Sequence, residues 1–367
     1  MRSNFVKDMF KAICKPFWLL VLPFLSSCGD DPPSGSENRH ITHPIAWVNP
    51  NGFAPADLPE DNPLTEEGVA LGRRLFYEVR LSGDNTMSCG SCHLPDHSFS
   101  DPSRFSVGID GIAGTLNAPP LINLAWQDFL FWDGRSNSLE EQAAQPIEDP
   151  IEMHEDWPNA LSELEADPMY PPLFKAAFGS SAVSRERIVK ALAQFERMLV
   201  SANSRYDGFK KGELTFTDLE LEGYNLFHSE QGDCFHCHGD LTTGNTFGAF
   251  GNLQFSNNGL DSVLIPGAGR EQVTGDPSDR GKFKIPTLRN IEYTSPYMHD
   301  GRFQTLGQVI EFYNEGGHVT PTTDPNMKAA GVGRNWSLRQ KQALRAFLSA
   351  LSDMEFITDT AFSDPFL

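Results

Sequence analysis

Apolar residues recur at helical spacing in several segments of the chain, with polar stretches between them. Between Ser184 and Ser201 the apolar side chains stand three or four positions apart and so share one face of a helix; they are Ile188, Leu192, Phe195 and Leu199. The same period appears near the C-terminus in Leu338, Leu344, Phe347, Leu348 and Leu351. Connections such as 242–282 are rich in Gly and Pro and carry few strand signals. The pattern predicts a mostly α-helical protein, with the face between Ser184 and Ser201 packed in a core.

Two other segments resemble each other. A helix-like stretch over 64–76 ends in Gly-Arg-Arg-Leu-Phe, and another over 216–227 ends in Gly-Tyr-Asn-Leu-Phe. Each is followed by a polar turn and then by a pair of cysteines. Thr217 and Glu220 have the spacing of a capping box, as do Ser337 and Gln340, so both helix starts are well marked. The repetition predicts an internal duplication.

The cysteine pairs carry the strongest chemical signal. Both stand in the pattern Cys-x-x-Cys-His, once as Cys89, Cys92 and His93, and once as Cys234, Cys237 and His238. Two thiols on one short turn can form thioethers to the two vinyl groups of one heme, and the following histidine then points at the iron. The sequence therefore predicts two covalently bound c-type hemes.

Three other interpretations leave part of this pattern unexplained. Disulfides would make the histidine after each pair a coincidence, twice. A zinc site would need both pairs on one metal although they lie far apart in the chain. A thioredoxin-like redox pair requires neither the histidine nor a second copy. We therefore expect two cytochrome c-like domains, and the helix after Ser337 resembles the terminal helix that packs across the N-terminal helix in small c-type cytochromes.

The N-terminal residues resemble an export signal. Basic residues are followed by a mostly apolar run over 16–25, which is too short to span a bilayer comfortably. Leu25-Ser26-Ser27-Cys28 resembles a lipoprotein signal, in which the cysteine takes the lipid; the alternative is an ordinary secretory peptide with an incidental Cys28. We predict a signal peptide over 1–27, a flexible tether over 28–45 and domains over 46–205 and 206–367. The protein would then be exported to the periplasm or cell envelope as a membrane-anchored lipoprotein.

The net charge limits the choice of partners. With 29 basic and 49 acidic residues, the chain has a formal charge of −20. This charge argues strongly against nucleic acid as a partner. It fits a basic protein partner, because complementary fields steer encounter. Alternatively, the charge serves only the solubility of an exported protein.

Several blocks outside the cysteine motifs resemble one family. From about residue 64 to residue 351, the chain is similar to the bacterial diheme cytochrome c peroxidases and MauG proteins. The blocks are Leu130-Phe131-Trp132-Asp133-Gly134-Arg135, Leu139-Glu140-Glu141-Gln142, Asn117-Ala118-Pro119, 146–153, Tyr170-Pro171-Pro172-Leu173-Phe174, Pro286-Thr287-Leu288-Arg289-Asn290 and Pro296-Tyr297-Met298-His299-Asp300-Gly301. The resemblance implies an enzyme that reduces hydrogen peroxide with electrons from a small c-type cytochrome or a cupredoxin.

The resemblance also assigns roles to single residues. It makes the heme on His93 the peroxidatic one and the heme on His238 the electron-transfer one. Gln142 and Glu152 match the distal pair, in which a carboxylate can shuttle a proton between the peroxide oxygens while an amide orients the peroxide. Trp132 matches a tryptophan between the hemes that can relay electrons. The alternatives are a solvated acid for Glu152 and a core residue for Trp132.

A calcium ion and a dimer belong to the same family pattern. Asn117, Thr294 and Pro296 match a calcium site between the domains, built from the side-chain and backbone oxygens that a hard cation requires. Homodimers are usual in the family, but the sequence shows no interface signal. Calcium at this site would fix the geometry between the two hemes.

Two positions depart from the commonest pattern of the peroxidases. Where many members have a loop histidine that blocks the peroxidatic iron, this chain has Ile109, which cannot bind iron. We therefore expect an open iron in the oxidised protein unless His97 substitutes, and we interpret His97 as an ordinary loop residue. The distal ligand of the second heme, usually methionine, aligns with Tyr313, as in MauG-type enzymes; the alternatives are ligation by Met298 or simple packing of Tyr313.

Three functions follow from these assignments. The first is a diheme cytochrome c peroxidase. The second is a MauG-type oxidase, which acts on a protein or other substrate through high-valent hemes; Tyr313 favours it. The third is a diheme electron carrier, which would need neither an open iron nor a distal acid.

Overall fold

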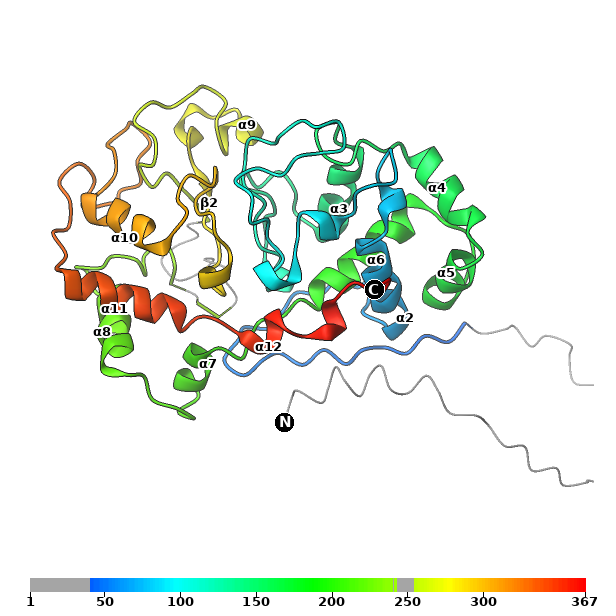
Figure 1. The fold of residues 1–367 in the computed structure, drawn as a ribbon, viewed down its shortest axis with the longest axis horizontal. Coiled ribbons are helices and arrows are strands. Elements are labelled where there is room, and N and C mark those ends of the chain that lie inside the picture. Colours follow the sequence, from blue (N-terminus) through cyan, green and yellow to red (C-terminus); the bar gives the residue numbers. More distant parts are fainter. Residues whose placement is uncertain (1–39, 240, 243–253) are drawn as a thin grey trace, which may run out of the picture.

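The computed structural model describes residues 40–239, 241–242 and 254–367, and within them the chain is mostly helical (Figure 1). The predicted signal peptide and most of the predicted tether lie outside these residues. The helices are α2 (Glu66–Phe76), α3 (Leu139–Glu148), α4 (Trp157–Ala166), α5 (Tyr170–Phe178), α6 (Arg185–Arg197), α7 (Arg205–Lys210), α8 (Asp218–Phe227), α9 (Glu271–Thr274), α10 (Leu306–Glu315), α11 (Leu338–Ser349) and α12 (Met354–Ile357). Two short strands, β1 (Phe255–Ser256) and β2 (Phe283–Lys284), pair antiparallel. No helix in these ranges is both long and apolar enough to cross a membrane.

The predicted duplication appears as two pairs of crossing helices. In the first lobe α2 packs against α6, and in the second lobe α8 packs against α11. Each crossing is tight because a glycine meets the backbone of the partner helix. A Cβ atom on Gly72 would lie 1.9 Å from the carbonyl oxygen of Ala191, and one on Gly223 would lie 2.0 Å from that of Ala343. As expected, the last long helix, α11, packs across α8, the helix that precedes the second heme motif.

The helix starts follow the predicted capping. The Oγ1 of Thr217 accepts a hydrogen bond from the backbone N–H of Glu220 at 3.3 Å, and the Glu220 carboxylate accepts one from the N–H of Thr217 at 2.7 Å. Ser337 and Gln340 form the same reciprocal pair at the start of α11. These contacts satisfy donors that the first turn of a helix leaves unpaired. Both predicted capping boxes are confirmed.

The two lobes have separate cores. The predicted apolar face between Ser184 and Ser201 is buried: Ile188, Leu192 and Phe195 of α6, and Leu199 just after it, are at most 1% exposed. The second core gathers around Phe347 of α11. Leu338 departs from the predicted apolar stripe: it is 70% exposed, because it is the first residue of α11 and its turn lies at the outer end of the helix.

The last residues of the chain return to the first lobe. Beyond α11 the chain passes through α12 and ends beside α2 (Figure 1). Phe356 and Phe362 pack in the core of the first lobe, and the hydroxyl of Tyr77 donates to the carbonyl of Phe362 at 2.7 Å. The segment after α11 was predicted as part of the second domain, yet it packs on the first lobe. The division at residues 205 and 206 stays a prediction.

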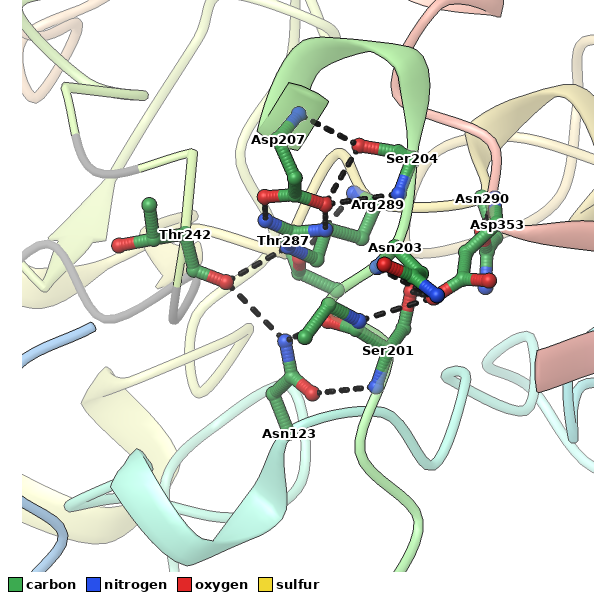
Figure 2. A network of polar contacts seen from close by, with 11 residues as sticks. Asn123, Ser201, Asn203, Ser204, Asp207, Thr242, Thr287, Arg289, Asn290 and Asp353 are labelled. Carbon is green, nitrogen blue, oxygen red and sulfur yellow. Dashed lines mark hydrogen bonds and ion pairs between the residues drawn. The ribbon is translucent and has the colours of Figure 1, made fainter. Parts of the chain in front are cut away.

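Buried polar contacts join the two lobes. Figure 2 shows Asp353 accepting hydrogen bonds from the backbone of Asn203, while Asn123 bonds both Ser201 and the carbonyl of Thr242. These contacts hold Ser201 and Asn203, the residues that lead from the first lobe to the second, in place. Unpaired polar groups would be costly in such a buried place, so the network favours one arrangement of the lobes.

A buried ion pair completes the network. Arg289 is 1% exposed and binds both carboxylate oxygens of Asp207, at 2.6 and 2.8 Å, while its Nε donates to the carbonyl of Thr242 at 2.6 Å (Figure 2). Although burial opposes ionisation, the guanidinium holds the pKa of Asp207 below its ordinary value. Asn290, the next residue, donates to the hydroxyl of Ser98 in the first lobe at 2.8 Å.

The helix crossing at Gly72 gives a direct test of the fold. We expect Gly72→Val to destabilise the protein by about 3 kcal/mol, since overpacking a tight contact forces the backbones apart. The exposed neighbour Ala70 provides the control, because Ala70→Val changes only helix propensity, at a cost of less than about 1 kcal/mol. Thermal unfolding followed by circular dichroism would measure both. Equal stability of the two variants would contradict the close crossing.

Candidate functional site

The first Cys-x-x-Cys-His motif forms one tight turn. Cys89 begins a 3-10 turn over Cys89–Ser91, and the N–H of His93 donates to the carbonyl of Cys89 at 3.0 Å. The His93 ring bonds the carbonyl of Phe99 through Nδ1 at 2.8 Å, which leaves Nε2 as the nitrogen for a metal. Burial lowers the pKa of His93, so the ring is held in the neutral form that binds iron.

The second motif repeats this arrangement. The N–H of His238 donates to the carbonyl of Cys234 at 2.9 Å. The ring of His238 hydrogen-bonds the backbone of Pro286, and burial lowers the pKa of His238 to about 4. No disulfide joins the two cysteines of either motif. A pair of cysteines beside an oriented imidazole is the set of groups that a covalent heme requires.

A large cleft lies against the second motif and has the shape and chemistry for a heme. Counting the part open to solvent, its empty space is about 1500 Å³. The two cysteines and His238 line one part of it, and most of the rest is apolar. The apolar side chains include Phe227, Ile285, Leu288, Ile310, Leu344 and Leu348. An apolar wall of this kind suits a porphyrin ring, which would fill the second core.

Both candidate distal ligands of the second heme line the same cleft. Tyr313 comes from α10, and Met298 comes from the loop before that helix. The side-chain amide of Asn258 donates to the hydroxyl of Tyr313 at 3.2 Å and lies 3.6 Å from the sulfur of Met298. Burial raises the pKa of Tyr313 to about 12, and the bond from Asn258 opposes this shift. Ligation by either residue stays a prediction.

On the other lobe, Glu152 lies close to the first motif. Its side chain is half-buried, and burial raises its pKa, with the charge of Asp149 adding to the shift and that of Arg135 opposing it. The thiols of Cys89 and Cys92 both lie within its electrostatic influence. The carboxyl group therefore keeps its proton to a higher pH than an exposed glutamic acid does, which suits a group that transfers protons beside the predicted peroxidatic heme.

The loop of Ile109 is fixed beside Glu152. The N–H of Ile109 donates to the carbonyl of Glu152 at 3.0 Å, so the two residues are neighbours through the backbone. Gln142 lies on α3 and is half-buried. The backbone of Met153 bonds the carbonyl of Pro146 near the end of that helix, which connects the loop of Glu152 to α3.

His97 lies in a different place from the loop of Ile109. It belongs to the turn after His93, where its carbonyl accepts hydrogen bonds from the backbone and hydroxyl of Ser100. The same turn supplies the Phe99 carbonyl to the His93 ring. The backbone of His97 therefore lies in the turn that follows the proximal histidine, and its interpretation as a loop residue stays a prediction.

Trp132 is held between the lobes. It is 9% exposed, and its indole nitrogen donates to the carbonyl of Asn117 at 2.7 Å. It lines the cleft of the second motif, and its ring centroid lies 6.4 Å from that of His299. The His299 ring stacks on Phe283 at 3.6 Å. These contacts leave the indole little freedom to turn.

The three predicted calcium ligands meet on the wall of the same cleft. Asn117, Thr294 and Pro296 all line it. The side-chain amide nitrogen of Asn117 donates to the carbonyls of Ser103 and Arg104, while its main-chain carbonyl accepts a hydrogen bond from Trp132. The three residues thus line one cleft, and calcium binding stays a prediction.

The described residues also contain an acidic cluster that the sequence interpretation did not include. Glu230, Asp233 and His236 place possible ligand atoms within 4.8 Å of one another. Lys328 lies 2.5 Å from Glu230 and 3.4 Å from Asp233, and Arg334 also pairs with Asp233. Cations of the protein therefore already neutralise much of this cluster.

Sequence reasoning missed three groups of the site. The carbonyls of Phe99 and Pro286 orient the two histidines, but a main-chain carbonyl has no signature in the sequence. Asn258 stands in an irregular Asn- and Gly-containing segment without periodicity. Only the fold shows that this segment lies against Tyr313.

Comparison with known proteins places these features in a family. A family model described as di-haem cytochrome c peroxidase matches residues 66–215. Cytochrome c551 peroxidase of Nitrosomonas europaea is 40% identical over 261 residues, which cover 70% of this chain and 74% of the relative. Methylamine utilization protein MauG of Methylorubrum extorquens is 36% identical over 295 residues, which cover 80% of each chain.

Solved structures support the same family and fold. The crystal structure of a MauG-like protein associated with microbial copper homeostasis has a TM-score of 0.79 and 36% identity, covering 88% of this chain and all of that one. The diheme peroxidase BthA of Burkholderia thailandensis, at 22% identity, has a TM-score of 0.67 over 85% of this chain and 90% of its own, and supports the fold. With two cytochrome c-like lobes and a heme attachment motif in each, the chain belongs to the family of di-haem cytochrome c peroxidases and MauG proteins.

Proposed function

We propose that the protein is an exported cytochrome c peroxidase that reduces hydrogen peroxide to water. The observation that carries this proposal is the half-buried carboxyl of Glu152, with its raised pKa, beside the first heme attachment motif. An electron carrier has no need of such a group. Two bound c-type hemes supply the redox chemistry, namely two electrons and an iron that binds peroxide.

The distal residues move the protons. Glu152 accepts a proton from one peroxide oxygen and returns it to the other, so that the leaving oxygen departs as water. Burial shifts the pKa of Glu152 upward, toward neutral pH, which suits a group that must both take and give a proton. Gln142 on α3 orients the peroxide through its amide.

Access to the first heme is open in this proposal. The residue in the loop beside Glu152 is Ile109, whose alkyl side chain offers no donor atom for iron. His97 lies in the turn after His93, where its carbonyl bonds Ser100, which supports its assignment as a loop residue and not as a blocking ligand. The oxidised protein should therefore accept peroxide without a preceding reduction.

Trp132 supplies the route for electrons between the hemes. Its fixed indole lines the cleft of the second heme, and its hydrogen bond to Asn117 ties it to the predicted calcium site. Calcium held by Asn117, Thr294 and Pro296 would stiffen this region. The electrons come from a small c-type cytochrome or cupredoxin, and the charge of −20 favours a basic donor.

The proposal places the protein in the periplasm or cell envelope. A lipid on Cys28 would anchor it to a membrane, and the residues up to 45 would serve as a tether. A homodimer, as is usual in the family, is compatible with this arrangement.

A second function deserves a test because of one contact. Tyr313 and Asn258 form a hydrogen-bonded pair in the cleft of the second heme, and a phenolate ligand would stabilise the oxidised states of that heme. This would suit a MauG-type oxidase, which stores oxidising equivalents for another substrate.

Replacement of Glu152 tests the proposed proton transfer. We expect Glu152→Gln to lower peroxide-dependent oxidation of a reduced c-type cytochrome by about a hundredfold or more, since an amide cannot shuttle the proton. Glu165→Gln, which changes an exposed acid of α4, should leave the rate unchanged. Stopped-flow and steady-state rates would measure both. An undiminished rate in Glu152→Gln would favour the electron carrier.

Replacement of Tyr313 separates the two enzymes. We expect Tyr313→Met to raise the reduction potential of the second heme, because a thioether favours the ferrous state, and to retain most of the peroxide turnover. Tyr313→Phe removes the phenol without adding a thioether and serves as the control. If Tyr313→Met keeps both hemes but loses turnover, the MauG-type function is favoured instead.

A further inference from the structure

One residue of the first lobe, Glu196, differs in kind from its counterpart in the internal repeat. The two helix crossings correspond: Gly72 meets Ala191 and Phe195 of α6, and Gly223 meets Ala343 and Phe347 of α11. The sequences then read Ala-Leu-x-x-Phe-Glu in α6 and Ala-Leu-x-x-Phe-Leu in α11. Glu196 therefore occupies the position of Leu348.

That position faces a heme. Leu344 and Leu348 both line the cleft of the second motif. By the repeat, Leu192 and Glu196 face the corresponding space at the first motif. The electrostatics agree with this placement, since burial is the first cause of the raised pKa of the Cys89 thiol and the charge of Glu196 is the next. A carboxyl group would thus stand beside the heme on His93, where the second lobe has an alkyl group.

Glu196 is an unusual core residue. It is only 4% exposed, and its Oε2 has no hydrogen-bond partner among the described residues. Its neighbour Arg197 is already engaged, because its guanidinium binds both carboxylate oxygens of Glu140 at 2.7 and 2.9 Å. A buried carboxylate without such pairing is costly, so the neutral acid is favoured. Burial raises the pKa of Glu196 to about 8, Arg197 opposes the shift and Glu140 adds to it.

Charged groups on the other elements around α6 are turned elsewhere. On α2, Glu67 binds His43, Arg73 binds the carbonyl of Ser363, and Arg74 lies over the ring of Phe366. Glu66 stands in the first turn of the same helix, at its exposed end. Glu67, Arg73 and Arg74 are thus each engaged with a partner other than Glu196.

The remaining neighbours add little charge. On α3, Glu141 caps the backbone of Asn137 and Glu148 binds Arg185, so Glu140 is the acid of that helix that acts on Glu196. The 3-10 turns over Leu124–Trp126 and Thr360–Phe362, which also approach α6, contain no ionisable side chain. The charge state of Glu196 is thus set mainly by its burial and by the charge of the heme on His93.

We propose that Glu196 couples protons to electrons at the heme on His93: its carboxyl group takes up a proton from solvent when that heme gains an electron, and releases it when the electron leaves. The electron comes from the reductant of the heme, and no other bond forms or breaks. The physical reason is Coulombic. A carboxylate at the heme edge stabilises the oxidised iron, a neutral acid does not, and the low dielectric of the interior strengthens the difference. The inference requires the covalent heme but not the peroxidase activity.

Spectroelectrochemical titration of the holoprotein tests this role. In the wild type, the midpoint potential of the heme on His93 should fall as the pH rises from 6 to 10. In Glu196→Gln the potential at the alkaline end should be higher and the fall smaller, since the amide stays neutral. Any dependence due to Glu152 remains in both proteins, so their difference isolates Glu196. The potential of the heme on His238 should follow the same curve in both.

Glu186→Gln is the matched control, because Glu186 is an exposed acid of the same helix. It should reproduce the wild-type curve. Superimposable curves for wild type and Glu196→Gln would overturn the proposal, whatever the peroxide turnover. Should the variant fail to retain its hemes, redox-induced infrared difference spectra of the wild type decide the matter. They should show the carbonyl band of a protonated carboxylic acid lost on oxidation of the heme on His93 at alkaline pH, and the absence of any such band would also overturn the proposal.

Discussion

The close crossing of two helices at a glycine is the constraint on which each lobe depends. At Gly72 and at Gly223, backbone meets backbone, so the helix before each heme motif is fixed against the long helix that closes the lobe. In the second lobe this crossing borders the cleft beside the heme motif, and Leu348 lines that cleft. A bound heme would therefore be part of the core, and the proposed position of Glu196 would give the other heme a different environment.

The difference between the hemes arises from side chains on a shared scaffold. Both proximal histidines bond a main-chain carbonyl, which fixes the ring in the same way in each lobe. The lobes differ in the side chains near the motifs: Glu152 and Glu196 act on the Cys89 thiol in the first, and Tyr313 and Asn258 line the cleft in the second. The ion pair of Arg289 with Asp207 lies within the second lobe, and the carbonyl of Thr242 connects it to Asn123 of the first lobe. The two sites thus orient the proximal histidine in the same way but differ in the neighbouring side chains.

Much of this was predictable because the signals are local. Helical periodicity, capping boxes such as that of Thr217, and the two heme motifs each depend on residues a few positions apart, and the structure has the helices that they predicted. The contribution of Phe356 to the first core was not predictable, since the return of the chain depends on contacts between distant segments. The same holds for Asn258 and for the carbonyls of Phe99 and Pro286, whose roles follow from the fold alone.

The most direct test compares peroxide-dependent oxidation of a reduced c-type cytochrome by two preparations of the same protein. One is fully oxidised as isolated, and the other has been reduced by one electron beforehand. If Ile109 leaves the first heme open, the oxidised protein should turn over at once, at the rate of the pre-reduced one. Turnover only after reduction would mean that a ligand blocks the iron and would contradict the open site, and no turnover in either state would contradict the peroxidase function.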